Sequence, residues 1–70
     1  MGRGPAVLGT VVEILPRALY RVELEDGRMV TAHPGAGARR NFIRLLVGDK
    51  VAVTLMPGDP TRARVVRKEG

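Results

Sequence analysis

Arginine side chains are the groups in this sequence best suited to binding chemistry, and they gather in two short segments. Arg39, Arg40 and Arg44 form one segment, and Arg62 and Arg64 form the other. The planar guanidinium pairs with phosphate and stacks on bases, which the lysine ammonium cannot match. Residues two apart on a strand project from the same face, so Arg62 and Arg64 lie beside each other. The two segments together predict a surface that binds nucleic-acid phosphates.

The net charge is concentrated in the second half of the chain. Twelve Lys and Arg residues against seven Asp and Glu residues give a formal net charge of +5. Residues 1–38 carry four Arg and four acidic residues, whereas residues 39–70 carry eight cations and three acids. A localised excess of this kind is typical of a nucleic-acid-binding surface. The charge by itself is also compatible with a solubilising surface in an arginine-rich proteome.

The residue types needed for catalysis are missing. The chain contains no Ser and no Cys, and His33 is its single histidine. A histidine metal pair and a supported Thr-His-Asp arrangement are therefore excluded. The glycines at Gly35 and Gly37 lack the spacing and the Lys of a phosphate-binding loop. We expect a protein that is not an enzyme and that holds no metal or cofactor.

Period-two alternation of apolar and polar residues predicts β-strands over most of the chain. Asp26-Gly27 is a hairpin turn signal between two of these strands, and Pro57-Gly58-Asp59-Pro60 separates two others. The five predicted strands cover residues 8–15, 20–24, 29–33, 51–55 and 62–67. For residues 8–15, the alternation does not decide which side chains face the core, because both faces of this strand are largely apolar. In the other strands the inward residues are expected to be Tyr20, Val22, Leu24, Val30, Ala32, Val51, Val53, Leu55, Ala63 and Val65.

The alternation breaks between Pro34 and Asp49. Ala38, Phe42, Leu45 and Leu46 fall on one side at helical spacing, which predicts a short amphipathic helix there. Three strands, a short helix and two strands are the element order of an OB-fold, an all-β, five-stranded Greek-key barrel that binds oligonucleotides. We expect one domain over residues 1–70, with frayed ends at residues 1–6 and 68–70.

The positions of the two aromatic residues distinguish between two modes of RNA binding. Barrels that bind single strands stack bases on exposed rings, each worth about 1–3 kcal/mol. Tyr20 and Phe42 both lie on the apolar sides of their elements, so they are predicted to belong to the core. This favours a protein that recognises the shape and backbone of a folded RNA.

The sequence shows no signal for export or membrane insertion. No apolar run approaches the roughly 20 residues that span a bilayer, and Met1–Thr10 lacks the features of a signal peptide. We therefore expect a cytoplasmic protein with no membrane partner, and a monomer.

Several motifs of the chain match a known family. The chain resembles bacterial translation initiation factor one, an S1-like OB-fold family, from about Gly9 to Lys68, and the run through Phe42-Ile43-Arg44 is the most specific part. The matching motifs are Gly9-Thr10-Val11-Val12-Glu13, Leu15-Pro16, Tyr20-Arg21-Val22-Glu23-Leu24, Asp26-Gly27, Arg39-Arg40-Asn41-Phe42-Ile43-Arg44, Gly48-Asp49-Lys50-Val51 and Pro57 to Val66. In this chain Gly37-Ala38 stands where the family usually carries a Lys-Met pair.

The resemblance implies a factor that binds the A site of the small ribosomal subunit through its ribosomal RNA. Such a factor blocks elongator tRNA and cooperates with the other initiation factors. The RNA-binding residues that it implies are Arg39, Arg40, Arg44, Arg62 and Arg64, with His33 at the rim of the same face.

Two other interpretations remain open from the residues. A general single-stranded RNA chaperone of the cold-shock class would use the same basic surface, and it would require Tyr20 and Phe42 to face solvent. A structural ribosomal protein would stay on ribosomes through high-salt washing, whereas a cycling factor would wash off.

Overall fold

The structure is a computed structural model, and it describes residues 6–34 and 45–69. These ranges form five strands and one 3-10 turn, as the alternation of the sequence predicts for the strands. The elements are β1 (Val7–Leu15), η1 (Pro16–Ala18), β2 (Leu19–Leu24), β3 (Met29–Pro34), β4 (Lys50–Met56) and β5 (Asp59–Glu69). β5 runs further than the alternation predicts, because Lys68 pairs with Val51 and Glu69 pairs with Lys50.

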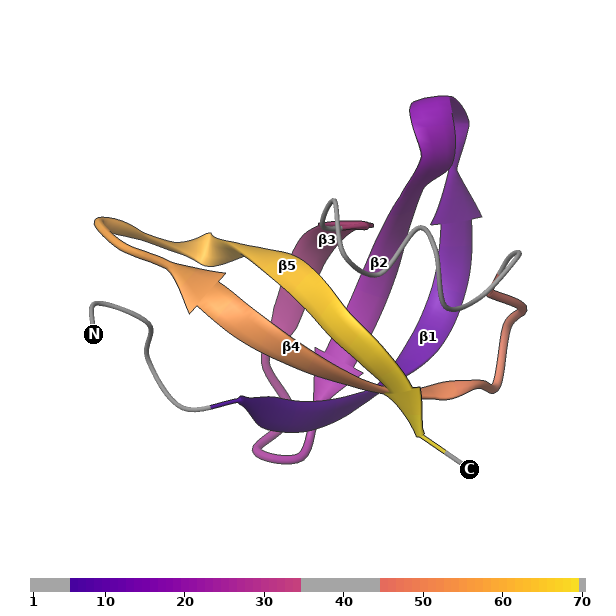
Figure 1. Cartoon of the computed structure of the whole chain (residues 1–70), viewed down its shortest axis with the longest axis horizontal. Helices are drawn as coiled ribbons and strands as arrows, with labels where there is room; N and C mark the ends of the chain where they lie inside the picture. The colour runs from indigo at the N-terminus through magenta and orange to yellow at the C-terminus, as the bar shows by residue number, and fades with distance from the viewer. Residues whose placement is uncertain (1–5, 35–44, 70) are drawn as a thin grey trace.

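The five strands close into a barrel in the order β1-β2-β3-β5-β4. Neighbouring strands are antiparallel except for β3 and β5, which pair in parallel. β1 curves around the barrel, so that its first half lies along β4 and its second half along β2 (Figure 1). This strand order confirms the predicted all-β, five-stranded barrel.

The barrel interior is filled by the residues that alternation predicts to face inward. Nine of the ten are buried, and Leu55 is half-buried and packs against the same cluster. The side chains with less than 2 % exposure are Leu45, Val11, Val22, Val51, Val53 and Val65. Burying these branched aliphatic side chains supplies the main driving force for folding, about 25 cal/mol for each Å² removed from water.

Most of the predicted helix between the third and fourth strands lies outside the described residues, which exclude 35–44. At its expected end, Leu45 and Leu46 are not helical. Leu45 is buried as expected, but Leu46 is 54 % exposed, so its predicted place on the apolar side is wrong. The reason is a local turn: Leu46 N–H donates to Asp49 Oδ2 at 2.8 Å, and Asp49 N–H donates to the Leu46 carbonyl at 3.0 Å.

A β-bulge in β1 explains why the direction of this strand could not be predicted. The register passes from Val11 opposite Val22 to Glu13 opposite Arg21, so Val12 is an extra residue. Beyond a bulge of this kind, the side chains that would have faced the core face solvent, and those that would have faced solvent face the core. Val11 before the bulge therefore faces the core, and Glu13 after it faces solvent.

Backbone geometry fixes the tight places of the barrel. At the predicted Asp26-Gly27 turn, Gly27 adopts a φ of 91° and donates its N–H to the Leu24 carbonyl at 2.9 Å. At Gly9, a Cβ would lie 2.5 Å from Val22 Cγ1 and 3.0 Å from the carbonyl oxygen of Glu23. β1 can approach β2 this closely only because Gly9 has no side chain.

Within residues 6–34 and 45–69, no helix has the length and apolar character that crossing a membrane requires.

Candidate nucleic-acid interface

The parallel pairing of β3 with β5 brings His33 and Arg64 side by side. The register places His33 opposite Arg64 and Thr31 opposite Arg62. The residues between them, Ala32 and Ala63, are fully buried in the core. Since alternate residues of a strand point to opposite faces, all four neighbours project outward. We call these outward residues, Thr31, His33, Arg62 and Arg64, the cationic face.

The two arginines of the cationic face form no ion pair with a described acidic side chain. In the described parts of the chain, the ion pairs involve Arg21, Arg28, Arg67 and Lys68, and neither Arg62 nor Arg64. Both side chains are exposed. An exposed guanidinium is well suited to contact a phosphate, because it presents several charged donors in a planar fork.

His33 is half-buried at the edge of this face. Its Nδ1 lies 3.3 Å from the carbonyl oxygen of Pro34, and it donates a hydrogen bond there when Nδ1 carries the ring proton. In that tautomer Nε2 is an acceptor, whereas an imidazolium donates from both ring nitrogens.

Three of the predicted RNA-binding residues, Arg39, Arg40 and Arg44, lie outside the described residues. Of the six predicted residues, the structure brings together His33, Arg62 and Arg64. Pro34, the last described residue before this range, pairs with Val65 in β5.

Asp59 is hydrogen-bonded at the start of β5. Its Oδ1 accepts from the Thr61 hydroxyl at 2.6 Å and from the Thr61 backbone N–H at 3.1 Å. These two hydrogen bonds, with a further contribution from the Arg62 charge, hold the pKa of Asp59 below its ordinary value. A carboxyl whose pKa falls on folding stabilises the folded state above its unfolded pKa, and this contribution is lost as the pH falls.

A test of this role compares the wild type with Asp59→Asn. The melting temperature of the wild type should exceed that of the variant at pH 7. The difference should shrink once the pH falls below about 4, where the carboxyl becomes protonated. Thermal unfolding followed by circular dichroism between pH 7 and pH 2.5 measures this difference. A difference that stays constant across this range would contradict the assignment.

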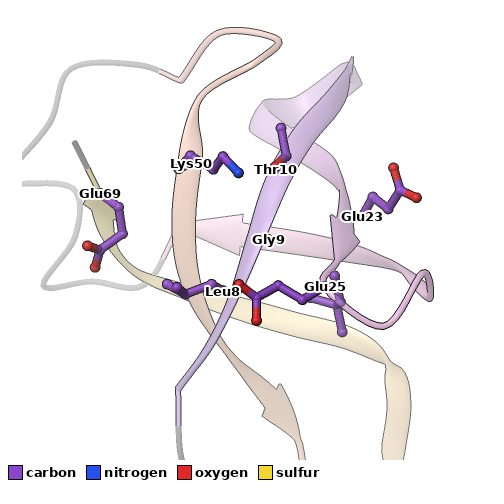
Figure 2. A pocket seen from close by; sticks show the side chains of 8 residues that line it. Leu8, Gly9, Thr10, Glu23, Glu25, Lys50 and Glu69 are labelled. Atoms are coloured by element: carbon purple, nitrogen blue, oxygen red, sulfur yellow. The ribbon is translucent and has the colours of Figure 1, made fainter.

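A pocket of about 290 Å³ lies elsewhere on the barrel, and sequence reasoning did not point to it. Its lining residues are Leu8, Gly9, Thr10, Glu23, Leu24, Glu25, Lys50 and Glu69. Figure 2 shows Lys50 directed toward Thr10 and the Glu25 carboxylate lying across β1 near Leu8. Three carboxylates against one ammonium repel phosphate, so this pocket does not belong to the candidate interface.

Tyr20, one of the two aromatic residues, is 8 % exposed and belongs to the core. This confirms its predicted burial, and the ring is not available to stack on a base. Phe42 lies outside the described residues.

The closed order of the five strands, with β3 and β5 paired in parallel, defines a small OB-fold barrel. No family model matches the chain. A solved structure does: the solution structure of translation initiation factor one from the Wolbachia endosymbiont strain TRS of Brugia malayi. It is 31 % identical in sequence, superposes with a TM-score of 0.75, and aligns over 94 % of this chain and 78 % of its own. The chain belongs to the family of translation initiation factor one.

Proposed function

We propose that this protein is a non-enzymatic translation initiation factor that binds the A site of the small ribosomal subunit through ribosomal RNA. There it blocks elongator tRNA and cooperates with the other initiation factors. The observation that carries the proposal is the cationic face, on which Arg62 and Arg64 are exposed and unpaired among the described residues. Family membership supports the initiation role.

The proposed binding mode is recognition of the RNA backbone. The guanidinium groups of Arg62 and Arg64 would pair with phosphates, and His33 would donate to a neighbouring phosphate or base. Burial of Tyr20 leaves no described aromatic ring for stacking, which supports a folded RNA as the partner over a general single-stranded RNA chaperone. Arg39, Arg40 and Arg44 are proposed as further contacts on the family resemblance.

The experiment that tests the proposal is binding of the labelled protein to purified small subunits at 50 mM and 200 mM salt. A generic single-stranded RNA is added as competitor. Each neutralised phosphate releases counterions, so three to five contacts should weaken binding by about 20-fold to 500-fold over this range. The competitor should not displace the protein.

Two other results would change the conclusion. Displacement by the generic RNA at a similar concentration would indicate a barrel that binds RNA without choosing its site. Binding that does not respond to salt, and that survives high-salt washing, would indicate a structural ribosomal protein.

A further inference from the structure

The bulge in β1 places an acidic residue beside an arginine at the border of the cationic face. If the register continued without the bulge, Val12 would lie opposite Arg21, and Glu13 would lie opposite Tyr20, whose side chain is in the core. With it, Glu13 lies opposite Arg21 on the outer side of the barrel. Bulges commonly redirect a side chain in this way, and here the redirected side chain is Glu13.

Arg21 lies in the same outward row as the cationic face. Arg21 is opposite Thr31, and Thr31 is opposite Arg62, so one row crosses β2, β3 and β5. β3 lies between the other two strands in the barrel order (Figure 1). Adjacent strands are about 4.8 Å apart, so the backbones at Arg21 and Arg62 are about 10 Å apart across the sheet. Arg21 can therefore reach an RNA that lies on Arg62.

The ion pair between Arg21 and Glu13 is poorly formed. Arg21 Nε lies 3.2 Å from Glu13 Oε1, and the two side chains are 44 % and 60 % exposed. Nε itself is buried, and in the described parts of the chain it has no hydrogen-bond partner, so its N–H does not point at the carboxylate. An exposed pair without two aligned hydrogen bonds belongs to the weakest class of ion pairs. Glu13 therefore holds the Arg21 guanidinium only weakly, and a competing anion can displace the carboxylate.

On the basis of the proposed function, we propose that Arg21 is a further RNA-contacting residue, which exchanges Glu13 for a backbone phosphate when RNA binds. Glu13 then stands unpaired beside the RNA and opposes binding. An RNA whose backbone brings a phosphate to Arg21 compensates for this repulsion, and an RNA that contacts only Arg62 and Arg64 does not. The pair thus favours a backbone that crosses from β5 to β2.

The test measures binding to purified small subunits for Arg21→Ala, Glu13→Gln and the double variant. Arg28→Ala is the matched control, because Arg28 is also exposed and ion-paired, to Asp26 in the turn that precedes β3. Arg21→Ala should bind about 10-fold more weakly, and its salt slope should fall by about one. Glu13→Gln should bind about threefold more tightly, and the double variant should regain part of the loss. Arg28→Ala should stay within twofold of the wild type.

The opposite effects of the two single variants separate this role from a structural one. If the pair only held β1 to β2, both substitutions would lower the melting temperature and both would weaken binding. That result, or an Arg21→Ala variant that binds like Arg28→Ala, overturns the inference while salt-sensitive wild-type binding leaves the proposed function standing. Salt-insensitive binding of the wild type overturns both.

Discussion

Replacing Arg62 and Arg64 together with alanine is expected to weaken binding to small ribosomal subunits by about 100-fold. A charge-assisted hydrogen bond contributes roughly 1.5 kcal/mol at the low end of its range, so two losses amount to about 3 kcal/mol. The salt slope should also fall by about two, since two phosphates are no longer neutralised. Both side chains are exposed, so the melting temperature should change by only a few degrees.

The control for this experiment is the double variant Arg28→Ala/Arg67→Ala. It removes the same charge, but both of its arginines are ion-paired, Arg28 with Asp26 and Arg67 with Glu69. A purely long-range attraction between a basic protein and RNA would make the two double variants equally weak. Equal losses would therefore show that the cationic face is not part of the binding site and that binding depends only on the net charge of the protein.

Replacing Gly9 with alanine is expected to lower the melting temperature by about 10 °C. The new Cβ would lie 2.5 Å from Val22 Cγ1 and 3.0 Å from the Glu23 carbonyl, which forces β1 away from β2. Overpacking of this kind costs typically 1–3 kcal/mol, and 1 kcal/mol shifts the melting temperature of so small a protein by about 4–8 °C. Thermal unfolding by circular dichroism or calorimetry measures the shift.

Two further variants show whether the close contact is the cause. Gly58→Asn is the control, because Gly58 has a φ of 78° but no neighbouring atom within 4 Å of an added Cβ. Asparagine tolerates this conformation, so the variant should lose little stability. In a Val22→Ala background, which removes Cγ1, Gly9→Ala should cost less than in the wild type. A shift of 3 °C or less for Gly9→Ala alone would contradict the packing argument.

The sequence predicted the barrel well wherever one face of a strand is apolar and the other polar. Tyr20, Val22 and Leu24 alternate with Arg21 and Glu23, and their burial follows that alternation. The alternation did not predict which residues of β1 are buried, because both faces of this strand are apolar and the bulge at Val12 exchanges them. The predicted burial of Leu46 was wrong because helical spacing was applied to a segment that makes a turn at Asp49.

The candidate site could be predicted in part. The spacing of Arg62 and Arg64 was enough to place both on one outward face. The proximity of His33 and Arg64 follows from the strand order of the fold. It could not be predicted from a local pattern, because the two residues are far apart in the chain. The pairing of Arg21 with Glu13 was missed, since it depends on a register shift that leaves no signal in the alternation.

The parallel pairing of β3 with β5 also has a consequence for the time at which the protein can begin to act. Strands so far apart in the chain pair late, because closing a long loop costs entropy before the new contacts repay it. During synthesis, which adds about 5–20 residues each second, the nascent chain carries β3 as an unsatisfied edge until β5 has been made. His33 and Arg64 meet only at that last step, so an incomplete chain on a translating ribosome does not yet carry an assembled cationic face.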